Sequence, residues 1–195
     1  MKIIGLTGGI GMGKSTAANI LRRAGIPVFD ADAAVHGLQA CGARAVRKIA
    51  ALFPDAVVKG AVDRGILRGI ALSEPGALQK LEAILHPMVR KEENRFLARC
   101  RRAGKRLAVL DIPLLFETGG DKRVDHVLVV TAPRDVQIHR LRLRGRMTQP
   151  EIAAFIAKQM PDRDKRRRAD SVVKTGLSRH YTQRRLRALL RKLLV

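Results

Sequence analysis

Residues Gly8 to Ser15 have the types and spacing best suited to chemistry. They read Gly8-Gly9-Ile10-Gly11-Met12-Gly13-Lys14-Ser15 and fit the pattern G-x-x-x-x-G-K-[ST]. Glycines let a backbone curl so that several N–H groups point at phosphate oxygens, and a helix that follows adds its positive N-terminus. Lys14 is expected to reach the β- and γ-phosphates, and the Ser15 hydroxyl to complete the shell of Mg²⁺. The run predicts a nucleoside-triphosphate site, with ATP-binding residues Gly9, Ile10, Gly11, Met12, Gly13, Lys14, Ser15 and Thr16.

Two carboxylates after the next apolar run indicate which reaction such a site performs. P-loop motors, helicases and GTPases share the loop, so the loop alone does not name the chemistry. The sequence has neither an apolar strand ending in Asp-Glu nor an Asn-Lys-x-Asp signature, but it has Phe29-Asp30-Ala31-Asp32. Ligands bind at the carboxyl ends of parallel strands, which places both aspartates near the γ-phosphate. We expect Asp32 to be the base or orienting carboxylate for an acceptor hydroxyl, and Asp30 or Asp32 to help hold Mg²⁺ through water. The alternative for Asp32 is the N-cap of a helix starting at Ala33.

Arginines are expected to supply the positive charge that phosphoryl transfer needs. Arg140 and Arg144 are four residues apart in a basic helical stretch, so they share one face. They precede a short segment, Arg146 to Pro150, that could open a closing lid. Guanidinium groups arriving with a lid would neutralise the transferring phosphoryl group. A solvated basic face is the alternative interpretation. We expect both Arg140 and Arg144 to bind ATP, and we favour Arg140 as the catalytic arginine.

The elements that must position these groups alternate between strand and helix. Short Val- and Leu-rich runs with turn-like flanks predict buried strands, whereas apolar residues at helical spacing predict helices. The predicted strands are 3–7, 27–30, 106–111, 124–131 and 171–174, and the predicted helices are 15–24, 33–39, 43–53, 64–72, 76–102, 133–146, 149–160 and 182–194, with 161–168 as a charged connector. This order predicts an α/β fold in which helices cover a parallel five-stranded sheet.

Composition limits the class and location of the protein. The 195 residues suffice for one domain, and their hydrophobic content of 46% is normal for a globular core. No apolar run reaches the roughly 20 residues that cross a bilayer. The N-terminal apolar segment runs directly into the loop, so export would remove the loop, and we expect a cytoplasmic protein with no membrane partner. Cys41 and Cys100 lack metal-site spacing and are expected to be reduced thiols.

The formal net charge of +22 is the least ordinary bulk property. From Arg134 onward the chain has 18 Lys and Arg against 5 acidic residues. Such a surface could bind nucleic acid, attract ATP, or reflect an Arg-rich genome. Proteins that bind single strands often stack bases on aromatic side chains, but here Phe and a single Tyr181 are available without aromatic–basic interleaving. We therefore expect no specific nucleic-acid partner, and a monomer or weak oligomer.

Several segments, in order over nearly the whole chain, resemble the dephospho-CoA kinase family. The loop Leu6-Thr7-Gly8-Gly9-Ile10-Gly11 and Pro113-Leu114-Leu115-Phe116-Glu117 are much more specific than the general phosphate-loop pattern. The other shared segments are Asp30-Ala31-Asp32, Leu85-His86-Pro87, Gln137 with Arg140 and Arg144, Gln159, and Ala169-Asp170.

The resemblance implies a reaction and an architecture. ATP would phosphorylate the ribose 3′-hydroxyl of dephospho-CoA with Mg²⁺ required; another small hydroxyl compound (a nucleoside, nucleotide or sugar acid) is the alternative acceptor. One P-loop kinase domain, similar to nucleoside monophosphate kinases, would comprise a core (about 1–59, 106–139 and 169–195), a helical CoA-binding lobe (about 60–105) and a lid (about 140–168). By this resemblance the catalytic residues would be Asp32, Lys14 and Arg140, and the acceptor site would be lined by Asp32, His86, Pro113, Leu114, Leu115 and Glu117.

Two departures from the family pattern concern the loop and the C-terminal region. Met12 stands where the family usually has Ser, a position that contributes mainly its backbone N–H. The family usually shows Asn-x-Gly where this chain has Lys174-Thr175-Gly176, so no nucleotide contact by that Asn is carried over. Asp111 ends a predicted strand where a magnesium-holding carboxylate could lie, and its role stays open.

Overall fold

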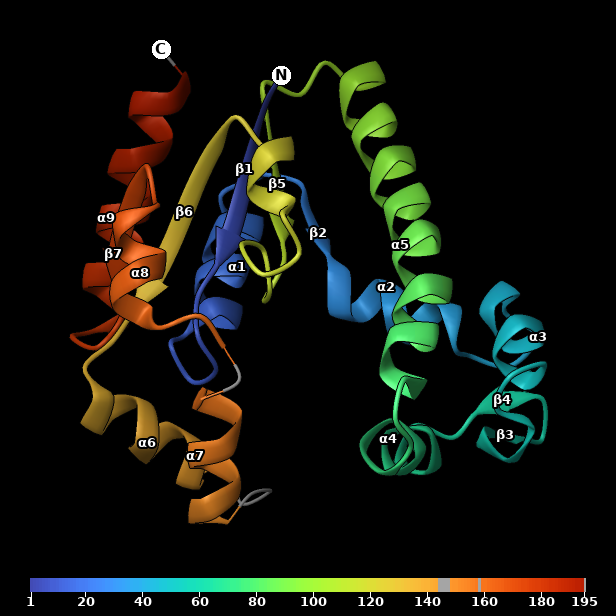
Figure 1. The fold of residues 1–195 in the computed structure, drawn as a ribbon. Helices are drawn as coiled ribbons and strands as arrows, with labels where there is room; N and C mark the ends of the chain where they lie inside the picture. The colour runs from blue at the N-terminus through green and yellow to red at the C-terminus, as the bar shows by residue number, and fades with distance from the viewer. Residues whose placement is uncertain (144–147, 158, 195) are drawn as a thin grey trace. The chain divides into compact units, whose positions relative to one another are not determined.

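The computed structural model describes residues 1–143, 148–157 and 159–194 (Figure 1). Its centre is a parallel five-stranded sheet in the order β2-β5-β1-β6-β7. Strand β1 pairs in parallel with both β5 and β6, and β6 with β7. The strands are β1 Lys2–Thr7, β2 Val28–Asp30, β5 Leu107–Asp111, β6 His126–Thr131 and β7 Ser171–Lys174. The predicted fold class is confirmed.

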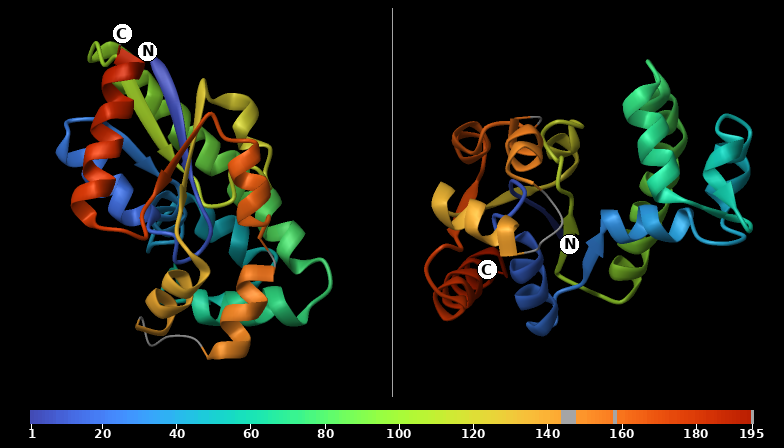
Figure 2. Two further views of the ribbon diagram at one scale, coloured as in Figure 1. Left: turned by 90° about the vertical axis from the view of Figure 1, so that its left-hand side faces the viewer. Right: turned by 90° about the horizontal axis from the view of Figure 1, so that it is seen from below.

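The sheet forms because its central strands are apolar along almost their entire length. All five residues of β5 are buried, as are five of the six in β1. Such continuous runs are typical of parallel strands that are covered on both faces. Helices α1 (Lys14–Arg23) and α9 (Arg179–Leu194) contribute Leu21 and Leu186 to the same core as Ile4 and Val109. The left view of Figure 2 shows the two chain termini at the same end of the first unit, where Lys2 Nζ donates to the Leu193 carbonyl at 3.3 Å.

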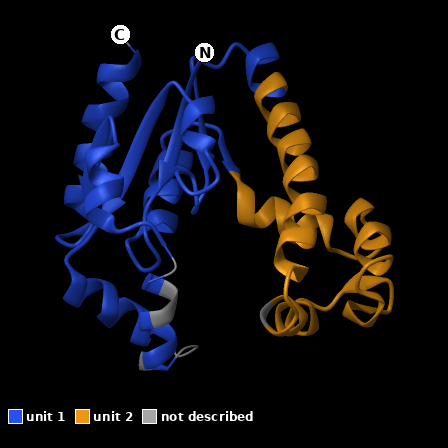
Figure 3. Ribbon diagram, in the orientation of Figure 1, with its two compact units in different colours: residues 1–29, 99–195 blue, residues 30–98 orange. Residues whose placement is uncertain are grey.

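The chain divides into two compact units, residues 1–29 with 99–195 and residues 30–98 (Figure 3). The second unit has its own core, in which Leu38 and Ile49 pack with Phe53, Leu67 and Leu85. The lobe was predicted at about 60–105, whereas the compact unit starts at Asp30, because the helices after β2 contribute to that core. The elements of this unit are α2 Ala31–Leu38, α3 Arg44–Ala50, the 3₁₀ turn Pro54–Ala56, the hairpin β3 Val57–Val58 and β4 Ala61–Val62, α4 Arg64–Ser73, and most of α5 Ala77–Arg102.

The remaining helices belong to the first unit. They are the 3₁₀ turn Gly120–Arg123, α6 Arg134–Leu143, α7 Gln149–Ala157 and α8 Asp162–Arg167. The prediction of a connector at 161–168 is wrong, because α8 forms there. Asp162 and Asp164 lie in its first turn and Lys165, Arg166 and Arg167 in its last, an arrangement that complements the helix dipole. Among the described residues, no helix combines the length and hydropathy of a membrane span.

Candidate active site

The phosphate loop connects β1 to α1 at the carboxyl edge of the sheet. Gly11 and Gly13 have φ angles of 76° and 87°, in the left-handed region that favours glycine. A Cβ on Gly13 would also lie 2.7 Å from Thr175 Oγ1. The Met12 side chain is buried, and its Sδ accepts a hydrogen bond from Ala132 N at 3.1 Å. The departure at Met12 therefore anchors the loop to the segment that follows β6.

Lys14 of the loop is paired with Asp111. Its Nζ lies 2.7 Å from Asp111 Oδ1, and only 3% of the Asp111 side chain is exposed. Asp111 is the last residue of β5, and in the parallel register it lies opposite Leu6 of β1. The sequence left the role of Asp111 open, and its position at the end of a predicted strand was the only signal. The structure brings this carboxylate to the cation of the phosphate loop.

Arg140 of α6 also lies at the loop. Its guanidinium donates to the Thr175 hydroxyl at 3.1 Å, to the Thr175 carbonyl at 2.6 Å and to the Gly11 carbonyl at 3.4 Å. Thr175 Oγ1 donates in turn to the Met12 carbonyl at 2.6 Å. Thr175, which sequence reasoning did not select, thus connects Arg140 to the loop. Arg144 lies outside the described residues, as does the beginning of the segment expected to open a lid.

Two glutamines hold the Ile10 residue of the loop from both sides. Gln159 Oε1 accepts a hydrogen bond from Ile10 N at 2.9 Å, and Gln137 Nε2 donates to the Ile10 carbonyl at 2.7 Å. Both glutamines were noted in the resemblance, but without a role. They satisfy the backbone polar groups of Ile10, which fixes this part of the loop.

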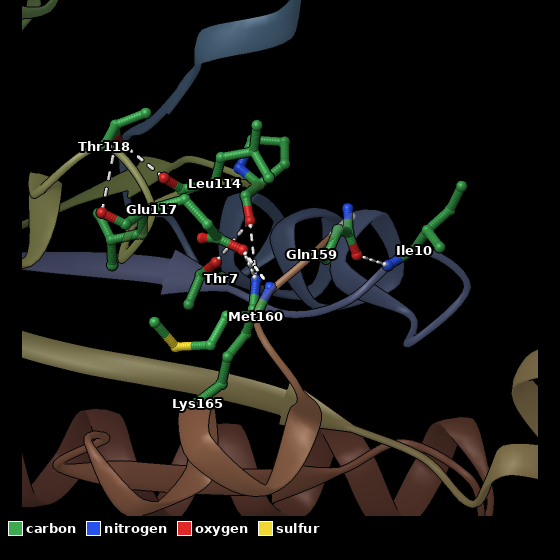
Figure 4. Close-up of polar contacts among 10 residues, drawn as sticks. Thr7, Ile10, Leu114, Glu117, Thr118, Gln159, Met160 and Lys165 are labelled. Atoms are coloured by element: carbon green, nitrogen blue, oxygen red, sulfur yellow. Dashed lines mark hydrogen bonds and ion pairs between the residues drawn. The ribbon is translucent and has the colours of Figure 1, made fainter. Parts of the chain in front are cut away.

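The 113–117 segment contacts both the residue before the loop and a buried lysine (Figure 4). Thr7 Oγ1 donates to the Pro113 carbonyl at 2.9 Å. Glu117 Oε1 lies 2.8 Å from Lys165 Nζ and accepts from Met160 N at 3.0 Å. Burial alone raises the pKa of Glu117, but the hydrogen bond from Lys165, backbone N–H groups and the Lys165 charge together lower that pKa below its usual 4.5. Glu117 is therefore ionised at neutral pH.

A cavity of about 620 Å³ adjoins the loop in the first unit. Gly9 and Met12 line it, together with both glutamines, and Lys14, Ser15 and Thr16 are not among its described lining residues. The cavity therefore adjoins Gly9 and Met12 of the loop rather than the first residues of α1. Its lining includes the cations Arg134, Arg166 and Lys174 and the carboxylate Asp162, which lies 2.9 Å from Arg166.

Asp30, Asp32 and His86 belong to the second unit. Asp30 Oδ1 accepts a hydrogen bond from Ala33 N at 3.0 Å, so Asp30 is the N-cap of α2. The cap alternative for Asp32 is therefore wrong. Asp32 is exposed in the first turn of α2, and His86 is exposed on α5 before a proline inside the helix. The structure describes these side chains within their own unit, and their catalytic and substrate-binding roles stay predictions.

Comparison with known proteins places the chain in a family. The model of the dephospho-CoA kinase family matches residues 2–179. Dephospho-CoA kinase of Gluconobacter oxydans is 49% identical, covering 99% of this chain and 98% of the relative. That of Paramagnetospirillum magneticum is 57% identical, covering 85% and 78%.

Solved structures share the fold of this chain. The structure of TT1252 from Thermus thermophilus matches with a TM-score of 0.86 and 38% identity, covering 98% of this chain and 97% of that one. Dephospho-CoA kinase from Campylobacter jejuni (TM-score 0.73, 22% identity, coverage 98% and 96%) shares the fold. With a family match over most of the chain and relatives near 50% identity over nearly its full length, the chain belongs to the dephospho-CoA kinase family.

Proposed function

We propose that the protein transfers the γ-phosphoryl group of ATP to the ribose 3′-hydroxyl of dephospho-CoA, giving CoA and ADP. Membership of the dephospho-CoA kinase family supports this reaction and disfavours the alternative acceptors. The observation that carries the proposal within the structure is the phosphate loop between β1 and α1, with Lys14 and Arg140 both at it. These two cations suit a triphosphate whose charge rises at the transferring group.

The chain's own residues divide the work of the transfer. Loop N–H groups and the start of α1 bind the phosphates, and Lys14 exchanges Asp111 for phosphate oxygens. Asp32 accepts the proton of the 3′-hydroxyl. The hydroxyl oxygen forms a bond to the γ-phosphorus, and the bond from that phosphorus to ADP breaks. Arg140 neutralises charge on the phosphoryl group. His86, with Pro113, Leu114, Leu115 and Glu117, lines the acceptor site.

The phosphate loop offers an oxygen donor that fits a bound Mg²⁺. Among the described residues, no three His, Cys, Asp or Glu side chains cluster as in an all-protein metal cage. Mg²⁺ is commonly held by substrate phosphates and waters with one or two protein oxygens, so the Ser15 hydroxyl fits this ion, with help from Asp30 or Asp32 through water. When bound, the ion neutralises charge on the β- and γ-phosphates.

We further propose roles for the larger segments. Residues from about 60 to 105, within and next to the helical unit, help bind the CoA portion of the acceptor. Residues from about 140 to 168 act as a lid that excludes water while the phosphoryl group moves, a common requirement in kinases because water competes as acceptor.

A product assay tests the function. Protein, ATP and Mg²⁺ are incubated with dephospho-CoA or, separately, with a nucleoside, a nucleotide or a sugar acid, and products are resolved by mass. We expect dephospho-CoA to gain one phosphoryl group, with one ADP released for each product formed. Faster transfer to another acceptor contradicts the proposal. The variant Lys14→Met, measured in parallel, controls for a contaminating kinase.

A further inference from the structure

Lys165 is a charged residue in a place where charge is costly. It lies in α8 with 0% of its side chain exposed, whereas Arg163 and Arg166 of the same helix are exposed. Removing an ammonium group from water is unfavourable unless ionic and hydrogen-bond partners replace the solvent. Because apolar residues of similar volume often replace a buried ion pair without loss of stability, packing alone does not call for this charge.

Both partners of Lys165 belong to the segment that follows β5. Its Nζ lies 2.8 Å from Glu117 Oε1 and donates to the Pro113 carbonyl at 3.5 Å. The same carbonyl accepts from Thr7 Oγ1 at 2.9 Å, and Thr7 is the residue before the first glycine of the phosphate loop. A single ammonium group therefore holds two points of the 113–117 segment, one of them joined directly to the start of the loop.

The Glu117 carboxylate extends this contact to the loop by a second route. Its Oε1 accepts from Met160 N at 3.0 Å, which fixes the backbone beside Gln159. The Gln159 side chain accepts from Ile10 N at 2.9 Å. Figure 4 shows Lys165 pointing toward Glu117, with Gln159 reaching Ile10 from the adjacent backbone. These contacts form a chain that runs from Lys165 through Glu117, Met160 and Gln159 to Ile10. It is called here the Lys165 relay.

We propose that Lys165 is a positioning residue for phosphoryl transfer, because the Lys165 relay fixes the 113–117 segment against the phosphate loop. The inference rests on the proposed function, in which this segment lines the acceptor site. Lys165 touches no reacting atom. It sets the separation between acceptor and γ-phosphate, and an error of about 1 Å in such a separation can cost a hundredfold in rate.

Kinetics of Lys165→Met test the role in catalysis. Methionine has similar length and no charge, so it fills the space without supporting Glu117. We expect kcat to fall at least about tenfold and KM for dephospho-CoA to rise about threefold, while the Kd of ATP changes less than about twofold. Arg163→Met is the matched control, because it removes the same charge from an exposed position of the same helix. Unchanged kcat and KM in folded Lys165→Met overturn the proposal.

Amide exchange, followed by NMR, tests the relay without relying on activity. We expect the Ile10 and Met160 amides to exchange at least about tenfold faster in Lys165→Met, with the buried Val129 amide of β6 as an internal reference for global opening. Arg163→Met should leave all three unchanged. An Ile10 amide that responds only as much as Val129 contradicts the relay, even if activity falls.

A second variant keeps the test decisive if Lys165→Met does not fold. Glu117→Gln retains an oxygen that can accept from Met160 N but removes the negative partner of Lys165, and the same rise in Ile10 exchange and fall in kcat are expected. If wild-type protein does not phosphorylate dephospho-CoA, the proposed function fails, whereas unaltered Ile10 exchange in both variants refutes the relay by itself.

Discussion

Lys14 Nζ lies 2.7 Å from Asp111 Oδ1, which joins the phosphate loop to the end of the neighbouring strand. The parallel pairing of β1 and β5 places Asp111, the last residue of β5, opposite Leu6 of β1, close to where the phosphate loop begins. Asp111 is almost entirely buried. Removing one partner of a partly desolvated ion pair strongly destabilises a protein, because the other charge is left without compensation. The pair therefore links the stability of the protein to the residue that binds phosphate.

Lys14→Met separates these two effects when it is compared with a double variant. We expect the single substitution to lower kcat at least about a hundredfold, because a cation at the transferring phosphoryl group is lost. It should also lower the free energy of unfolding by about 3 kcal/mol, because Asp111 loses its charged partner. Lys14→Met combined with Asp111→Asn should regain most of the stability and none of the activity, as measured by urea unfolding and product assay. A double variant as unstable as the single one argues against the pair as the cause.

Sequence patterns predicted the sheet because its signal is local. Continuous apolar runs such as 106–111 and 124–131 indicate buried parallel strands without knowledge of their neighbours. The α8 helix was missed because a run of six charged residues is typical of a solvated connector. Nothing in the sequence of 162–167 distinguishes buried Lys165 from exposed Arg163. The difference arises only when Glu117, far away in the chain, meets the ammonium group.

In the candidate site, too, some features were predictable from the sequence and others were not. The phosphate loop was predictable, because a local run of residues defines it. The role of Asp111 was not, since it depends on strand register, and neither was that of Thr175, whose contacts to Arg140 and Met12 require the packing of three separate segments. The helix cap was assigned to Asp32 as an alternative, although Asp30 performs it, because helix ends are defined by backbone geometry that sequence locates only to within a few residues.

Asp32→Asn tests the proposed general base. Asparagine keeps the size of the side chain but cannot accept the acceptor's proton, so we expect kcat to fall by roughly a hundredfold or more with little change in ATP affinity. Because Asp30 is the cap, the stability of α2 should be nearly unaffected. Asp55→Asn, at an exposed position of the same unit, is the matched control. Near-wild-type turnover of Asp32→Asn removes Asp32 from the chemistry.

Arg140→Gln tests the second cation at the loop. We expect kcat to fall about a hundredfold, because charge on the phosphoryl group is no longer neutralised. Thr175→Val removes the hydroxyl contact but leaves the bond from Arg140 to the Thr175 carbonyl, so its loss of kcat should be about tenfold. Arg179→Gln, at an exposed position of α9, serves as the control for net charge. Equal kcat in Arg140→Gln and this control shows that Arg140 has only a structural role.

Glu117 should make the stability of the protein depend on pH in the acid range. Burial is the largest single influence and raises its pKa, but the hydrogen bond from Lys165, backbone N–H groups and the Lys165 charge together outweigh burial, so the pKa in the folded protein lies below 4.5. The unfolded chain therefore binds the proton more readily, and this contribution to stability is complete above about pH 4.5 and is lost as the pH falls through the folded pKa. We expect the free energy of unfolding of the wild type to fall more steeply below about pH 4.5 than that of Glu117→Gln, in urea titrations at a series of pH values. Glu82→Gln, which replaces an exposed carboxylate of α5, should retain the wild-type slope. Parallel curves for wild type and Glu117→Gln would mean that Glu117 takes up its proton equally well in the folded and unfolded protein. That result would contradict a stabilising contact between Glu117 and the buried ammonium group of Lys165.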